Sequence, residues 1–188
     1  MRIISGKFKG HHLTAFKAAH IRPTTDRVKE TLFNKLMFEI ENVRVLDLFC
    51  GTGNLGLEAL SRGARHVTFV DAHKQSILIT RENLAKLKVE KGDYSVLQKD
   101  VLSYLKSYEG EPFDIIFADP PFTQKMAHEV MQAASQSQAF GPATVMTIES
   151  ERKERLEDHY PGLARYDVRE FGDKVLSFFH KPKESEGS

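Results

Sequence analysis

Short apolar runs alternate with segments of helical periodicity along most of this chain, and this alternation restricts the fold more than any other feature of the sequence. The apolar runs predict strands at residues 43–49, 66–71, 94–98, 113–119 and 144–150. Around them we expect helices at about 28–40, 55–62, 73–87, 101–107, 125–139 and 151–159. Strands that are joined through helices pair in parallel, so this order predicts an α/β fold built on a parallel sheet.

The end of the chain departs from the alternation. Two further apolar runs, at 164–171 and 174–181, are separated only by Gly172 and Asp173. A two-residue link closes a hairpin but is too short for a parallel crossover. We therefore predict a Rossmann-like class I fold of the S-adenosylmethionine-dependent methyltransferases, with a mostly parallel seven-stranded sheet and a C-terminal antiparallel hairpin. The hairpin distinguishes this arrangement from the NAD-binding fold.

A glycine-rich loop follows the first expected strand. Gly51, Gly53 and Gly56 have the spacing of a dinucleotide fingerprint, which permits a tight turn and a close approach of the backbone to a ligand. That spacing alone fits NAD as well as S-adenosylmethionine. Asp47, four residues before Gly51, favours the second cofactor, because a carboxylate attracts a methionine ammonium and repels a pyrophosphate. We assign Asp47, Phe49, Gly51 and Gly53 to the cofactor site.

Two further aspartates follow the next two strands. Asp71 ends the run 66–71, where an acid bonds the ribose hydroxyls of either cofactor class. Asp100 follows the run 94–98, and in the methyltransferase pattern this position meets the adenine amine. Asp100 would equally serve as the N-cap of the helix that follows it. Both aspartates are assigned to the cofactor site, with the capping role of Asp100 left open.

The tetrapeptide Asp119-Pro120-Pro121-Phe122 closes the fourth apolar run. A planar amino group resists methylation because its lone pair is delocalised, so a catalyst must fix the nitrogen and accept hydrogen bonds from its protons. The Asp119 carboxylate and the Pro120 carbonyl can do this, two prolines stiffen the turn, and Phe122 offers a stacking face. We assign Asp119, Pro120 and Phe122 to catalysis and Pro121 to substrate contact. A tight loop at a strand end would use the same tetrapeptide.

Positive charge is concentrated at the N-terminus, although the net charge of the chain is only +1. The first 25 residues contain no acid, and aromatic Phe8 and Phe16 are interleaved with the basic side chains. We expect residues 1–22 to form a basic hairpin suited to phosphate contact and base stacking, although a flexible or merely solvated leader would show the same charge pattern. The expected contacts are Arg2, Lys7, Lys9, Arg22 and, in the following helix, Arg27.

Composition favours one compact enzyme. The 188 residues contain no apolar run near the roughly 20 residues that span a bilayer, no signal-peptide core opens the chain, and Cys50 is the single cysteine, so we expect a cytoplasmic protein without membrane contact. Residues 23–181 are the expected catalytic domain, and 182–188 a disordered tail. The histidines and Cys50 lack the ligand spacing of zinc sites, and no metal is expected. Asn83 is interpreted as structural. Glu149 ends a strand and could face the site, although an acid at a strand end is more often solvated.

Nearly the whole chain resembles the RsmD-type bacterial enzymes, which methylate the exocyclic N2 of a guanine in 16S ribosomal RNA. The resemblance rests on residues 2–10, 22–30, 47–53, 55–64 and 119–122. The usual family motifs are Ala-Gly-Ser-Gly-Ala-Leu-Gly and Asp-Pro-Pro-Tyr, so the chain departs from them at Cys50, Thr52, Asn54 and Phe122. Phe122 keeps an aromatic face and loses a hydroxyl group.

The resemblance implies a set of functional expectations. The cofactor would be S-adenosylmethionine, with S-adenosylhomocysteine as product, and the partner would be 16S ribosomal RNA in an assembled or partly assembled small subunit. The segment that contains Arg22, Thr25 and Arg27 would close over the cofactor or hold RNA phosphate. We assign Thr25 to the cofactor and the two arginines to the substrate, and we expect a monomer.

Rival functions remain open at this level. An adenine-N6 DNA or RNA methyltransferase uses the same Asp-Pro-Pro-aromatic motif, although 188 residues leave little room for a target-recognition domain. A non-catalytic RNA-binding protein of ribosome assembly could keep the fold without turnover, but Asp47, Gly51, Gly53, Asp71 and Asp119 are all intact. The aspartates also disfavour an NAD-dependent oxidoreductase.

Overall fold

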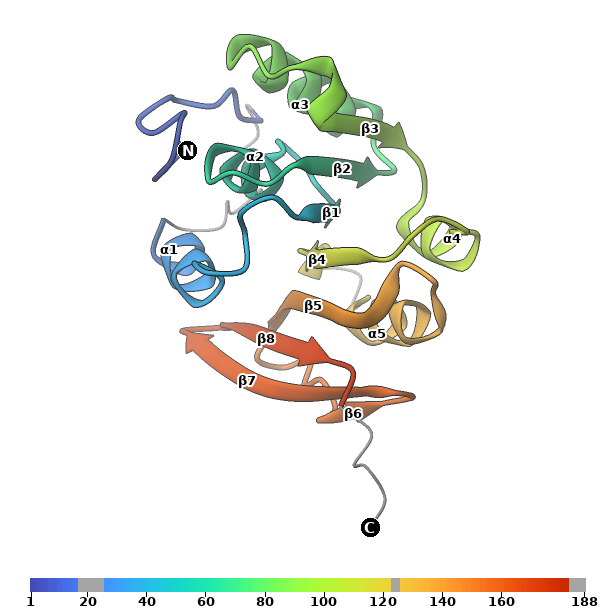
Figure 1. The fold of residues 1–188 in the computed structure, drawn as a ribbon. Coiled ribbons are helices and arrows are strands. Elements are labelled where there is room, and N and C mark those ends of the chain that lie inside the picture. Colours follow the sequence, from blue (N-terminus) through green and yellow to red (C-terminus); the bar gives the residue numbers. More distant parts are fainter. Residues whose placement is uncertain (17–25, 123–125, 183–188) are drawn as a thin grey trace. The chain divides into compact units, whose positions relative to one another are not determined.

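The computed structural model describes residues 1–16, 26–122 and 126–182, which form two compact units, Met1–Val101 and Leu102–Ser188 (Figure 1). Each unit carries its own strands and helices. The roles predicted for Arg22 and Thr25, the last part of the N-terminal hairpin and nearly all of the predicted disordered tail lie outside the described residues.

The first unit contains a parallel three-stranded sheet. Strands β1 (Arg44–Leu48), β2 (His66–Asp71) and β3 (Tyr94–Gln98) lie in the order β3-β2-β1, with Asp47 in register with Phe69. Helix α2 (Asn54–Ser61) packs on β1 and β2, and α3 (Lys74–Lys86) packs on β2 and β3. A short 3-10 helix, η1 (Lys91–Asp93), leads into β3. The β1-α2-β2-α3-β3 order is the one that the alternation of apolar runs predicts.

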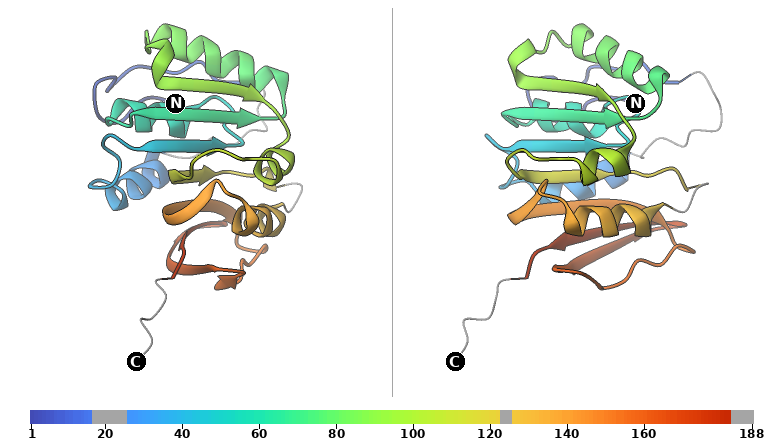
Figure 2. Two further views of the ribbon diagram at one scale, coloured as in Figure 1. Left: turned by 45° about the vertical axis from the view of Figure 1, so that its right-hand side comes forward. Right: turned by 90° about the vertical axis from the view of Figure 1, so that its right-hand side faces the viewer.

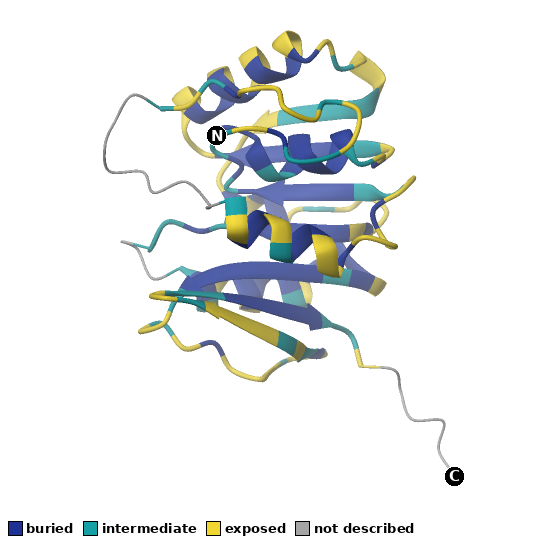
Figure 3. Cartoon of the chain, turned by 90° about the vertical axis from the view of Figure 1, so that its left-hand side faces the viewer, coloured by how far each residue is buried: buried dark blue, intermediate teal, exposed yellow. Residues whose placement is uncertain are grey.

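Burial explains the apolar runs of β1 and β2. Val45, Leu46, Val67 and Phe69 are almost completely buried, as parallel strands are when both faces are covered. Figure 3 shows β1 and β2 mostly in dark blue, whereas β3 is half-buried to exposed and the outer surface of α3 is yellow. Close packing also requires a residue without a side chain at position 56, because a Cβ at Gly56 would lie 2.3 Å from the ring of Phe69.

The second unit combines parallel and antiparallel pairing. Its strands are β4 (Phe113–Ala118), β5 (Phe140–Glu151), β8 (Lys174–His180), β7 (Leu163–Phe171) and β6 (His159–Tyr160), in that spatial order. Strands β4 and β5 are parallel, whereas β5-β8, β8-β7 and β7-β6 are antiparallel. Helix α5 (Ala127–Gln136) lies along β5 (Figure 2), and the short α4 (Val101–Lys106) precedes β4. The predicted fold class, including the C-terminal antiparallel hairpin, is confirmed, with β6 as a two-residue addition.

The helix predicted at 151–159 is wrong. Strand β5 continues to Glu151, and the following residues form turns instead. Their polar groups have tertiary partners: the Arg152 N–H donates to the Asp173 carbonyl at 2.7 Å, and Glu154 accepts the Ala127 N–H at 2.8 Å. These long-range contacts outweigh the helical propensity of a charged segment.

The first helix, α1 (Asp26–Lys35), ends earlier than predicted. Leu36 and Ile40 remain buried although they lie in and beside a turn. The spacing of Leu36 and Ile40 therefore indicates that both side chains are buried, and it does not indicate that the helix continues to them. Among the described residues, no helix has the length and apolar character that a membrane crossing needs.

Candidate functional site

The loop between β1 and α2 adopts a left-handed backbone at three positions. Gly51 and Gly53 have φ angles of 56° and 78°, which glycine adopts at little cost. Phe49 has a φ of 57°, which is uncommon for a residue with a side chain. Gly53 is also the N-cap of α2, so this loop brings backbone N–H groups to the start of a helix. The glycines of the motif are thus required by the turn itself.

Two predicted cofactor residues hold this loop. Asp47 is 2% exposed and accepts the Gly56 N–H at 2.9 Å through Oδ2. Asp71 accepts the Gly51 N–H at 3.0 Å through Oδ2 and the His73 N–H at 2.8 Å through Oδ1. A carboxylate has about four lone-pair sites, so these bonds leave Asp71 acceptor capacity for a ligand. Both aspartates therefore shape the loop as well as supplying charge beside it.

The electrostatics of the loop are visible in Cys50. Burial, and then the negative charges of Asp47 and Asp71, raise the pKa of the Cys50 thiol well above its ordinary value. Burial disfavours any charge, whereas the two aspartates disfavour anions and favour cations. Their charges therefore suit a ligand that carries an ammonium and a sulfonium better than one that carries a pyrophosphate.

Helix α3 contributes two loop contacts that the sequence analysis did not assign to the site. The Thr80 hydroxyl donates to the Gly51 carbonyl at 3.0 Å. Asn83 Nδ2 donates to the carbonyls of Thr52 at 2.9 Å and Thr14 at 3.0 Å, and Asn83 Oδ1 accepts the Thr14 N–H at 2.7 Å. The structural interpretation of Asn83 holds, and its partners are the glycine loop and the N-terminal segment. The sequence feature that could have predicted these contacts is the presence of two polar residues, Thr80 and Asn83, three positions apart on the helix face that is buried.

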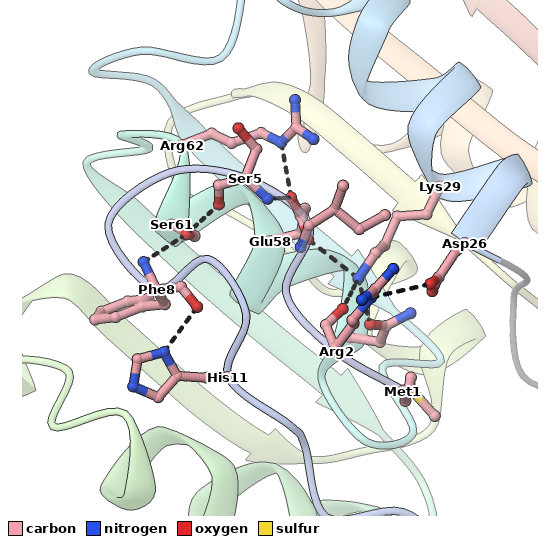
Figure 4. A network of polar contacts seen from close by, with 12 residues as sticks. Met1, Arg2, Ser5, Phe8, His11, Asp26, Lys29, Glu58, Ser61 and Arg62 are labelled. Carbon is pink, nitrogen blue, oxygen red and sulfur yellow. Dashed lines mark hydrogen bonds and ion pairs between the residues drawn. The ribbon is translucent and has the colours of Figure 1, made fainter.

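The N-terminal segment is ordered against α2 (Figure 4). An antiparallel bridge joins Arg2 to His12, and the Ile3 N–H donates to the His11 carbonyl at 3.0 Å. The Glu58 carboxylate accepts the backbone N–H groups of Ile4 and Ser5 at 2.8 and 3.0 Å. The described part of the N-terminal segment thus pairs with itself as a hairpin would and docks on the helix that follows the glycine loop.

A buried ion pair completes this docking. Lys29 and Glu58 have side chains 1% and 0% exposed, with their charged atoms 3.0 Å apart. Lys29 Nζ also donates to the Arg2 carbonyl at 2.6 Å and to Asn54 Oδ1 at 2.8 Å. Burial lowers the pKa of Lys29, while the neighbouring Glu58 acts against that change.

The predicted RNA-contact residues of the first unit lie on its surface. Arg2, Lys7, Lys9 and Arg27 are exposed. Arg2 forms an ion pair with Asp26 at 3.4 Å, and Lys7 Nζ lies 4.9 Å from the centre of the Phe8 ring. An aromatic ring with cations beside it can contact both a base and a phosphate.

The Asp-Pro-Pro-Phe motif belongs to the second unit. It directly follows β4, with Pro120 buried and Asp119, Pro121 and Phe122 half-buried. Lys174 Nζ lies 4.9 Å from the centre of the Phe122 ring and forms an ion pair with Glu149. Glu149 is buried, so its interpretation as a solvated acid is wrong. The residue looked solvated because its partner is distant in sequence.

The predicted cofactor residues that the structure describes all belong to the first unit and the catalytic residues to the second. Asp100 is exposed and directly precedes α4. Within the described parts of both units, no group of three or more histidine, cysteine, aspartate or glutamate side chains could hold a metal ion.

The chain is similar to known proteins in sequence and in fold. A family model described as conserved hypothetical protein 95 matches residues 1–180. Ribosomal RNA small subunit methyltransferase D of Haemophilus influenzae is 38% identical over 157 residues, which cover 83% of this chain and 81% of that protein. The putative rRNA methyltransferase YlbH of Bacillus subtilis is 35% identical over 183 residues, covering 96% and 99%. A solved structure described as the putative methyltransferase yhhF from Escherichia coli has a TM-score of 0.85 at 30% identity, covering 98% and 99%.

Proposed function

Because this chain belongs to the RsmD family of small-subunit ribosomal RNA methyltransferases, we propose that it transfers a methyl group from S-adenosylmethionine to the exocyclic N2 of one guanine in 16S ribosomal RNA. The observation that carries the proposal is the glycine loop held by Asp47 and Asp71 in a chain that also carries Asp-Pro-Pro-Phe. The first feature suits a cationic nucleoside, and the second suits a planar amine.

The residues of the first unit fit this cofactor. Burial, and then the charges of Asp47 and Asp71, raise the pKa of Cys50, and the charges of the two aspartates would attract the ammonium and sulfonium groups. Asp71 would bond the ribose hydroxyls, and Asp100 the adenine amine. Gly51 and Gly53 permit the backbone of the loop to approach the ligand closely. When bound, S-adenosylmethionine supplies an electrophilic methyl group and leaves as S-adenosylhomocysteine.

The residues of the motif would act on the amine. The target guanine stacks on Phe122 after it has left its helix or loop, as bases do in enzymes that modify them. The Asp119 carboxylate and the Pro120 carbonyl accept hydrogen bonds from the two N2 protons. As the nitrogen bonds to the methyl carbon it gains positive charge, which Asp119 stabilises until one proton leaves to solvent.

RNA affinity would come largely from the basic N-terminal segment. Arg2, Lys7 and Lys9 are exposed on an ordered scaffold, and each phosphate contact releases counterions. A few such contacts bind naked RNA weakly at physiological salt. We therefore expect an assembled or partly assembled small subunit as substrate and a monomeric enzyme.

The test is to incubate the protein with methyl-labelled S-adenosylmethionine and small subunits from a strain that lacks the endogenous enzyme. The RNA is then digested and the labelled nucleoside identified. N2-methylguanosine is the expected product. N6-methyladenosine would overturn the guanine assignment. If calorimetry shows that the protein binds the cofactor but no RNA is labelled, 16S ribosomal RNA is not the substrate. Absence of cofactor binding would favour a non-catalytic assembly protein.

A further inference from the structure

A lysine and a glutamate outside the motif lie beside it in the second unit. Lys174 Nζ lies 4.9 Å from the centre of the Phe122 ring and forms an ion pair with the carboxylate of Glu149. The two side chains are 12% and 5% exposed. A cation thus lies beside the ring on which the target base would stack, and an almost buried carboxylate holds it there.

The sheet explains how these residues meet. In the parallel pair β4-β5, Ala118 is in register with Ile148, so Asp119, which follows β4, and Glu149, which lies near the end of β5, are at the same carboxyl edge. In the antiparallel pair β5-β8, Glu151 is in register with Lys174, which brings the start of β8 to that edge as well. Figure 1 shows β4, β5 and β8 in succession.

The ion pair with Glu149 leaves the Lys174 ammonium able to donate further hydrogen bonds. An ammonium has three N–H donors, and the contact with Glu149 occupies one of them. A buried glutamate strongly favours a fixed cation over a mobile one, because separating the pair would leave a charge without compensation. Lys174 is therefore held in place, and its side chain is 12% exposed.

We propose that Lys174 is a specificity-determining residue that selects guanine by donating a hydrogen bond to its O6, and that Glu149 positions it. The proposal rests on the proposed function, in which the guanine stacks on Phe122 and presents N2 to Asp119. O6 is an acceptor that a lysine binds well, whereas adenine carries an N6 amine at the same position of the ring. The ammonium attracts the first base and repels the second.

The experiment compares guanine with 2-aminopurine, which keeps the N2 amine but lacks O6. Once the methylated position has been mapped, small subunits are reconstituted with either base at that position. The ratio of kcat/KM values is then measured by methyl transfer. For the unchanged protein we expect guanine to be favoured by about tenfold or more, the value of one charge-assisted hydrogen bond.

Substituting Lys174→Met removes the donor, and the ratio should fall by about tenfold or more, the part of the preference that the O6 contact supplies. This variant leaves Glu149 buried without its cation, so the double variant Lys174→Met with Glu149→Gln is measured alongside and should give the same ratio. Lys174→Arg retains a donor and should retain the preference. The matched control is Lys181→Met, because Lys181 lies 5.9 Å from the ring centre of Phe140, away from the motif.

The outcomes separate the two proposals. If the variants that lack Lys174 methylate N2 and still prefer guanine as the unchanged protein does, Lys174 is not the specificity residue. A merely structural role would lower activity on both bases and leave the ratio intact, which also contradicts the inference. No transfer to guanine by the unchanged protein would instead overturn the proposed function, and this inference with it.

Discussion

The Asp71 carboxylate accepts the backbone N–H of Gly51 at 3.0 Å, so the acid at the end of β2 holds the loop at the end of β1 in its left-handed turn. The same carboxylate accepts the His73 N–H through its other oxygen. One side chain thus links the geometry of the loop to the charge beside it. A substitution here should affect both.

We expect Asp71→Ala to weaken S-adenosylmethionine binding by roughly tenfold to a hundredfold, because the loss of a charged hydrogen-bond acceptor costs about 1.5–3 kcal/mol. Isothermal titration calorimetry measures the dissociation constant. Glu90→Ala, at an exposed acid of the same unit, is the control and should bind as the unchanged protein does. An unaltered affinity in Asp71→Ala would exclude Asp71 from the cofactor site.

Asp119→Ala should lower kcat by about a hundredfold or more and leave cofactor affinity unchanged, since a group that stabilises developing charge acts mainly in the transition state. Single-turnover methyl transfer and calorimetry measure the two quantities. Asp114→Ala changes an exposed acid on the preceding strand β4 and should retain activity. Near-normal turnover in Asp119→Ala would remove Asp119 from the mechanism.

The buried pair Lys29–Glu58 should matter far more for stability than a surface pair. Glu58→Gln leaves Lys29 without its charge partner in the interior, and we expect the free energy of unfolding to fall by about 3–5 kcal/mol. Glu170→Gln breaks the exposed pair with Arg152 and should cost less than about 1 kcal/mol. Urea denaturation measures both. Similar losses in the two variants would contradict the docking role of Glu58.

Gly56→Ala should destabilise the protein although alanine is the better helix former. The new methyl group would lie 2.3 Å from the Phe69 ring, and overpacking of this kind costs about 1–3 kcal/mol. Gly92→Ala is the matched control, because its Cβ would meet nothing within 4 Å. Thermal unfolding should show a lower Tm for the first variant alone. Equal Tm values would mean that α2 can move away from β2 without cost.

His66 should contribute a pH dependence to stability. Burial, and then the charge of Arg44, lower the pKa of His66 below its ordinary value of 6.5. Between the lowered pKa and 6.5 the unfolded chain binds more protons than the folded one, so stability falls as the pH falls through this range. Unfolding by urea between pH 7.5 and about 5 should show a weaker decline in His66→Gln than in the unchanged protein. An equal decline in the two proteins would exclude His66 as its source.

Local features of the sequence predicted the elements well where packing agreed with them. Strands β2 and β3 begin and end at the predicted residues. The charged stretch at 151–159 was predicted as a helix because its residues favour one, yet Arg152 and Glu154 are held by distant partners. Propensity is a property of neighbours in the chain, and it loses to tertiary contacts that are not encoded nearby.

The sequence by itself determined the alternation of strands and helices, the left-handed glycine turn, the position of Asp47 before it, the Asp-Pro-Pro-Phe motif and the family. These depend on a few consecutive residues, whose conformational preferences are local. Only the tertiary structure decided which partners the functional residues have. Asp71 reaches Gly51 across 20 residues, and Lys174 reaches Glu149 across 25. Such pairs arise from strand register, which brings together side chains that are distant in sequence at one edge of a sheet.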